Sequence, residues 1–274
     1  MAQTLRVLIT VKTYPIPSSK YDELVCTAGV TEIGDFVRLY PVNFRDLPYS
    51  SQYRKYQWIE VEATRHTGRD SRKESYRPNC DTIRLSGEPV TATKDNWAER
   101  AKYALAKKSP SIEHLHEQQE RDKTSLGIFK PKAVHDLIVS SDDSQWKSGF
   151  LNALRQQRLW ETRTASKEPP RKVPFKFQYR FECDDSRCKK NHQMMIEDWE
   201  VGALYWKYVD GGATPQEACQ KVKQKFLDQL CGRDRDTHFY VGTVLAHPKS
   251  WVVVGVYWPK VAPTSHLATS SLFD

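Results

Sequence analysis

The sequence predicts an α+β protein in which a small N-terminal β-barrel is followed by helices and by an α+β unit built on a zinc-binding hairpin. Short segments rich in Val, Ile, Thr and aromatic residues fill residues 1–92, and helical periodicity follows over residues 93–165. A strictly alternating strand then leads into two cysteines and a histidine within residues 166–260. These ranges are the expected domains, with a flexible tail over residues 261–274, and the three units can share one core.

The first unit contains strand-like segments separated by Pro, Gly, Asp and Asn. Short strands at roughly even spacing are typical of a small barrel or sandwich, and we expect an OB-like or SH3-like barrel. The segments cover residues 5–11, 22–30, 35–42, 56–66 and 81–87.

The middle unit is expected to be mainly helical. Apolar residues recur there at helical spacing, and Ser109 followed by Pro110 is a favourable start for a polar, exposed helix. The predicted elements are helices over 95–108, 109–123 and 142–160, a strand over 133–139, and a linker with two adjacent prolines over 161–172.

The last unit has the most regular pattern. Aromatic residues alternate with polar ones over residues 173–183, which predicts a half-buried strand. Thr214, Pro215 and Glu217 form the start signal of a helix, with a capping box. The remaining predicted elements are a return strand over 192–198, helices over 199–209 and 213–232, and two strands within 238–258 around the sequence HPKS.

A candidate metal site lies in the predicted hairpin. Four residues separate Cys183 from Cys188, and three separate Cys188 from His192. Thiolate and imidazole are the ligands that Zn²⁺ prefers, and the polar residues between them suit a turn. An exposed polar hairpin without metal is the alternative, whereas an iron–sulfur cluster would normally need four cysteines.

The fourth ligand is not evident from the spacing. Candidates are His238, Cys219, Cys231 or a water molecule. Because His238 opens a strand that can pair beside the hairpin, it is our expected fourth ligand. We expect the zinc site to be structural, since the motif lies in a hairpin and not in an obvious cleft.

Three carboxylates follow the hairpin and raise the possibility of catalysis. Glu197, Asp198 and Glu200 could hold Mg²⁺ or Mn²⁺ for phosphodiester hydrolysis. Alternatively, Asp198 is the N-cap of the next helix and Glu200 complements the helix dipole. Motifs typical of nucleotide-binding loops, serine hydrolases and zinc deaminases do not occur.

Cations gather beside aromatic residues in several stretches, which favours contact with phosphates and bases. The alternatives are a solvated charged surface or a site for an acidic protein or a nucleotide. The candidate nucleic-acid-binding residues are Arg38, Tyr40, Arg45, Arg54, Lys55, Arg65, Arg69, Arg72, Lys73, Arg77, Lys176 and Arg180.

The composition supports a binding protein and excludes several classes. The 274 residues carry a formal net charge of +8, and no apolar run approaches the ~20 residues of a membrane helix. The uneven cysteines do not resemble a secreted disulfide framework, and we expect a cytoplasmic protein without a membrane partner.

The sequence therefore predicts a zinc-stabilised protein that binds DNA or RNA without catalysis of its own. A metal-dependent nuclease that uses the carboxylates after the hairpin is one alternative. A module that binds a partner protein through its basic loops or the helix at 109–123 is the other.

Overall fold

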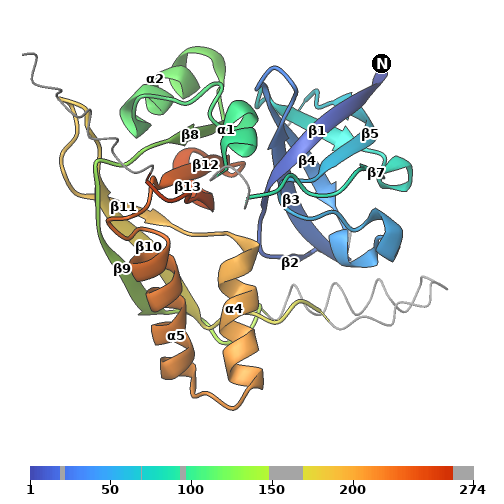
Figure 1. Cartoon of the computed structure of the whole chain (residues 1–274). Coiled ribbons are helices and arrows are strands. Elements are labelled where there is room, and N and C mark those ends of the chain that lie inside the picture. The colour runs from blue at the N-terminus through green and yellow to red at the C-terminus, as the bar shows by residue number, and fades with distance from the viewer. Residues whose placement is uncertain (19–21, 69, 93–96, 148–168, 262–274) are drawn as a thin grey trace, which may run out of the picture.

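A computed structural model describes residues 1–18, 22–68, 70–92, 97–147 and 169–261. The N-terminal strands form a seven-stranded sheet in the order β1-β3-β4-β6-β5-β7, with β2 on β3. Because β1 also pairs with β5, five strands close into a barrel, as the sequence predicts (Figure 1). The strands are β1 (Ala2–Lys12), β2 (Ile16–Ser18), β3 (Asp22–Val30), β4 (Phe36–Val42), β5 (Trp58–Arg65), β6 (Ser75–Pro78) and β7 (Arg84–Ser86).

Strand β6 closes the barrel, although it is not among the segments that the sequence predicts as strands. It is four residues long, and Arg38 and Leu39 of β4 pair with it in parallel. Such a short strand has no room for a clear alternation of apolar and polar residues, which explains why its pattern did not reveal it. Short 3₁₀ helices connect neighbouring strands at Phe44–Asp46, Tyr49–Ser51 and Cys80–Thr82.

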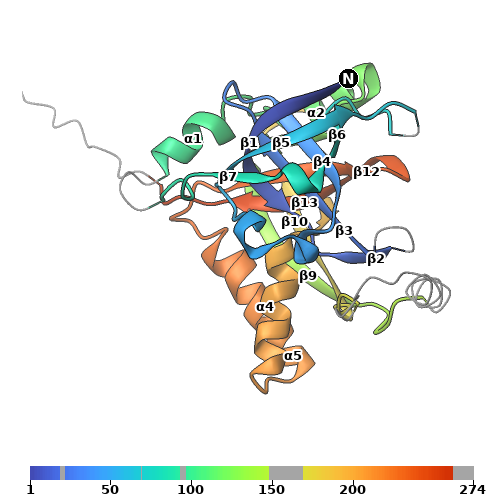
Figure 2. The ribbon, with the colours of Figure 1, turned by 90° about the vertical axis from the view of Figure 1, so that its right-hand side faces the viewer.

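The rest of the described chain combines helices with two three-stranded sheets, β11-β10-β9 and β13-β12-β8. Helices α4 and α5 pack side by side at the end of the molecule away from α2 (Figures 1 and 2). The elements are α1 (Ala98–Ala104), α2 (Ile112–Asp122), β8 (Leu126–Phe129), β9 (Ala133–Ser141), β10 (Phe175–Glu182), β11 (His192–Met195), α4 (Trp199–Asp210), α5 (Pro215–Lys223), β12 (His238–Val244) and β13 (His247–Tyr257).

Several boundaries differ from the sequence-based expectation, and two of these differences change the type or place of an element. The predicted helix over 213–232 begins at its Thr214 capping box but continues after Lys223 as a π-helix, Gln224–Gln229. The HPKS residues start β13, and they are not the turn between the last two strands. Most of the predicted helix over 142–160 and the predicted tail lie outside the described residues, and none of the described helices is long and apolar enough to cross a membrane.

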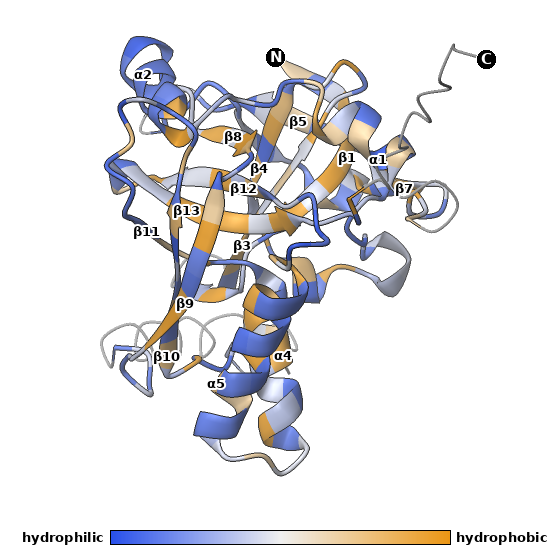
Figure 3. Ribbon diagram, turned by 60° about the vertical axis from the view of Figure 1, so that its left-hand side comes forward, coloured by the Kyte–Doolittle hydropathy of each residue, from blue (hydrophilic) through white to orange (hydrophobic). Residues whose placement is uncertain are grey.

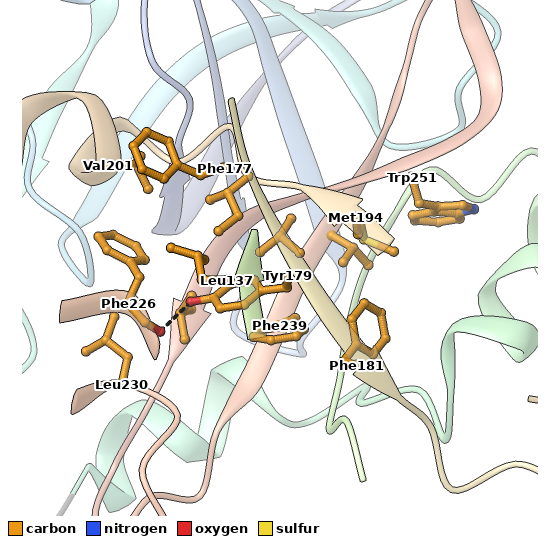
Figure 4. Packing of buried hydrophobic residues seen from close by; sticks show 14 of the residues in the cluster. Leu137, Phe177, Tyr179, Phe181, Met194, Val201, Phe226, Leu230, Phe239 and Trp251 are labelled. Atoms are coloured by element: carbon orange, nitrogen blue, oxygen red, sulfur yellow. Dashed lines mark hydrogen bonds between the residues drawn. The ribbon is translucent and has the colours of Figure 1, made fainter. Parts of the chain in front are cut away.

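The buried side chains form three clusters. One lies inside the barrel, and the largest surrounds the alternating face of β10, where the Tyr179 hydroxyl donates to the Phe226 carbonyl oxygen at 2.7 Å (Figure 4). The remaining cluster joins barrel residues such as Leu8 and Tyr56 to Ile128 and Tyr240 of the last sheet. Hydrophobic residues recur along several strands, such as β8 and β13, whereas much of α2 and α5 is hydrophilic (Figure 3).

Candidate functional site

Four side chains from two distant parts of the chain form a group that could hold a metal ion. They are Glu113 in the first turn of α2, Cys183 and Cys188 in the loop after β10, and His192 at the start of β11, and their potential ligand atoms all lie within 4.8 Å of one another. Phe181 pairs with His192 across the hairpin, which brings the histidine back beside Cys183. Among the described residues this is the one such group of three or more potential ligands.

The polar contacts within the group suit a cation. His192 Nε2 lies 2.7 Å from Glu113 Oε1 and 3.2 Å from Cys188 Sγ. The backbone N–H groups of Cys183 and Lys190 donate to Cys188 Sγ at 3.2 and 3.3 Å. Glu113 Oε2 is buried and has no hydrogen-bond partner among the described residues, so the group has an acceptor that a cation would satisfy.

Burial shapes the chemistry of the group. It raises the pKa of the Cys183 thiol to about 12, with a further contribution from the charges of Glu113 and Cys188. The thiol therefore keeps its proton at neutral pH until a cation replaces it, and metal binding would release that proton. Two sulfur ligands, one nitrogen and one oxygen are compatible with tetrahedral coordination.

The structure brings together three of the sequence-predicted ligands but not His238. That side chain is 1% exposed in β12, its Nδ1 lies 3.1 Å from the Asp236 carbonyl oxygen, and its ring packs edge-on against Tyr257. The fourth member is Glu113, which belongs to the predicted polar helix over 109–123. Sequence spacing missed it because nothing local marks one of several acids in that helix as a ligand.

Among the described residues, the carboxylates after the hairpin form no group that could hold a metal ion, and Asp198 and Glu200 instead both pair with Lys55. Asp198 is buried, caps α4 by accepting from the Glu200 N–H, and pairs with Lys55 at 2.8 Å. Burial raises the pKa of Asp198 to about 6, and also that of Glu197. Burial also disfavours the Lys55 ammonium, but the attraction of Asp198 outweighs it and raises the lysine pKa. The capping interpretation of Asp198 is the one that the structure supports.

A basic groove runs between the barrel and α2. We use this name for the pocket of about 670 Å³ whose cations are Arg65, Lys73, Lys107 and Lys108. Its acids are Asp35 and Glu74, and its aromatic residues are Phe36 and Tyr76.

Arg65 connects the groove to a second pocket. This outer pocket, of about 430 Å³, is also lined by Tyr40, His66 and Arg77. The Arg65 guanidinium lies 5.8 Å from the centre of the Tyr76 ring. Four sequence-predicted residues, Tyr40, Arg65, Lys73 and Arg77, are thus gathered around one corner of the barrel.

Several other residues that the sequence predicts to bind nucleic acid form hydrogen bonds or ion pairs within the protein. Arg38 is 1% exposed and donates to Ser125, so it is structural and a phosphate cannot reach it. Arg72 pairs with Asp70 at 2.7 Å, and Arg45 pairs with Glu23 at 2.9 Å.

The remaining predicted cations that the structure describes lie apart from the groove lining. Lys55 pairs with Asp198, and Lys176 pairs with Asp142 at 3.1 Å. Arg54 and Arg180 are exposed, and Arg69 lies outside the described residues.

Comparison with known proteins gives two family matches. The family model described as "Domain of unknown function (DUF8757)" matches residues 107–274, and the one described as "Domain of unknown function (DUF8758)" matches residues 3–106. Comparison with curated proteins gives no match. A solved chain described as "Structure of murine DNA binding protein bound with ds DNA" is 12% identical, with a TM-score of 0.29 and coverage of 95% of this chain and 97% of that chain. A TM-score this low does not establish a shared fold.

Proposed function

We propose that this chain, which belongs to the family of the DUF8757 domain of unknown function, is a zinc-stabilised nucleic-acid-binding protein without catalysis of its own. The observation that carries the proposal is the position of Arg65 at the junction of two pockets, among Arg77, Lys73, Lys107 and Lys108. Clustered cations neutralise phosphates, and aromatic rings beside them, here the half-buried Phe36, Tyr40 and Tyr76, can stack on bases.

The charges that line the groove favour an anionic ligand. Four of its lining residues are cationic and two are acidic. Lys73 pairs with Asp122 at 2.9 Å and Lys107 pairs with Asp35, but all four side chains are more than a third exposed. An exposed ion pair of this kind contributes little stability, so a phosphate can compete for the lysine.

Zinc is the metal that best suits the four-residue group. Cysteine sulfur, histidine nitrogen and a carboxylate oxygen are all established zinc ligands, and a closed set of four protein ligands is typical of structural sites. We propose Cys183, Cys188, His192 and Glu113 as those ligands. Zinc there would tie α2 to the β10–β11 hairpin and supply folding free energy.

Nucleic-acid binding is tested with the double variant Arg65→Ala/Lys108→Ala. Its matched control is Lys207→Ala/Lys221→Ala, which removes the same charge from exposed positions on α4 and α5. Fluorescence anisotropy with labelled single-stranded DNA, double-stranded DNA and RNA, measured over a salt series, is the readout.

We expect the groove variant to lose affinity about tenfold or more and to reduce the salt slope by about one to two, because each lost phosphate contact lowers that slope by ~0.9. The control variant should bind as the wild type does. Absence of salt-dependent binding to all three probes would refute the function. An equal loss in both variants would show that net charge matters and the groove does not.

A further inference from the structure

We infer that the metal ion controls the basic groove, because helix α2 contributes both a metal ligand and one wall of the groove. The inference rests on the proposed function, since it concerns regulation of the same binding site. It assigns the ion a role beyond general stabilisation: the metal-bound chain would bind nucleic acid and the metal-free chain would bind it weakly.

One side of α2 is tied to the metal-binding loop. Glu113 Oε1 lies 2.7 Å from His192, and one turn later Glu117 pairs with Arg187 of the same loop. The N-cap hydroxyl of Ser111 donates to Asp185 Oδ2 at 2.7 Å. The first two turns of the helix are therefore held by polar contacts to the loop that would carry the ion.

The neighbouring side of α2 forms a wall of the basic groove. His114, Leu115 and Gln118 line it, opposite the barrel residues Arg65 and Tyr76. Each residue turns an α-helix by about 100°, so His114 and Gln118 lie roughly a quarter turn around the helix from Glu113 and Glu117. Because both sides belong to one helix, a shift of α2 at the metal group would also move the side chains that line the groove.

Removal of the ion would weaken the attachment of α2. Glu113 would lose its cation while one of its oxygens stays buried, with no hydrogen-bond partner in the described part of the chain, which is unfavourable. The helix has 11 residues, too few to be stable without tertiary contacts. Its remaining anchors would be the contacts of Ser111 and Glu117 with the loop and the apolar side chains of Ile112 and Leu115, the latter packed against Gly127 of β8.

The barrel wall of the groove does not depend on the metal group. Arg65 and Tyr76 are held by strands β5 and β6, which pair with each other and with the rest of the barrel. Metal loss should therefore lower the affinity for nucleic acid without abolishing it. A change of about tenfold lies within the usual range of coupling between two sites.

The experiment compares the full chain loaded with Zn²⁺ and after chelation, with metal content measured in each sample. Binding of a labelled single-stranded DNA is followed by anisotropy, hydrogen exchange of α2 and of the barrel strands by mass spectrometry, and folding by circular dichroism. The test variant is Glu113→Gln. The matched control is Glu120→Gln, which removes the same charge from an exposed position two turns along the same helix, where it pairs with Lys249.

We expect chelation to weaken binding about tenfold and to raise exchange in α2 while the barrel strands stay protected. Glu113→Gln should bind zinc less tightly, and its affinity for the DNA should differ little between the zinc-loaded and chelated samples. Glu120→Gln should keep the wild-type difference in affinity between these samples. Equal affinity in the loaded and metal-free states would overturn the coupling while the proposed function stands. Global unfolding on chelation would also overturn it, in favour of an ion that only stabilises the fold. Lack of binding in the loaded wild type would refute the function itself.

Discussion

Lys12 is the clearest case of a side chain whose charge conflicts with its surroundings. Its ammonium lies 4.0 Å from the centre of the Phe44 ring and 5.2 Å from that of Trp199, near Lys55. Burial and the charge of Lys55 lower its pKa from 10.5 to about 8, and the attraction of Asp198 and Glu200 only partly offsets this. The aromatic rings help to hold a cation that the barrel half-buries.

The lowered pKa of Lys12 predicts a pH-dependent contribution to stability. Between about pH 8 and 10.5 the unfolded chain binds more protons at this position than the folded chain. The contribution of Lys12 to the free energy of unfolding therefore rises with pH over that window. We expect the wild type to gain stability relative to Lys12→Met from about pH 7 to pH 10 in urea unfolding. A constant difference between the two proteins would contradict the prediction.

The four-residue metal group shows which potential ligands a sequence pattern can predict and which it cannot. Cys183, Cys188 and His192 could be predicted because one hairpin holds all three, so their spacing in the chain reflects their spacing in space. Glu113 comes from a helix 70 residues before Cys183 and is placed by tertiary packing. For the same reason the sequence predicts that Arg38 contacts nucleic acid, whereas the fold buries its side chain against Ser125.

Elements with strong periodicity or capping signals were predictable, and weakly patterned ones were not. The alternation in β10 and the capping box of α5 both occur as expected. Strands β6 and β8 have four residues each, too few for a period to show, and they owe their existence to neighbouring strands. The groove between the barrel and α2 likewise depends on the mutual position of elements that the sequence does not define.

Helix α4 tests the packing between elements. A Cβ atom at Gly202 would lie 2.2 Å from the Tyr14 ring. Two hydrogen bonds keep Tyr14 in place: its N–H donates to the Glu197 carbonyl oxygen, and its hydroxyl donates to the Arg171 carbonyl oxygen. We expect Gly202→Ala to lower the free energy of unfolding by about 1–3 kcal/mol, although alanine favours helices by ~1 kcal/mol. Urea unfolding measures this. The double variant Gly202→Ala/Tyr14→Ala should lose less free energy of unfolding than the two single variants lose together, because the smaller alanine in place of Tyr14 leaves room for the new methyl group. Additive losses would contradict the steric explanation.

At the scale of the whole molecule, the two family matches meet between residues 106 and 107, but the core continues across that point. One cluster contains Leu8 and Tyr56 before it and Ile128 and Tyr240 after it. Ser125 lies directly before β8 and forms hydrogen bonds with two barrel residues. Its hydroxyl donates to Glu74, and its carbonyl oxygen accepts from Arg38. The barrel thus completes its packing with strands that belong to the other match.

This shared core predicts that the two halves fold together. Separation at residue 106 would expose the apolar cluster on both sides and leave the buried charges of Arg38 and Glu74 without Ser125. We expect the full chain to unfold in one transition, with coincident curves from tryptophan fluorescence and far-ultraviolet circular dichroism. Fragments 1–106 and 107–274 should each lack a cooperative transition, because burying apolar area is the main stabilising contribution and each fragment loses part of it. Two separate transitions in the full chain, or a cooperatively folding fragment 1–106, would show that the barrel is an independent unit.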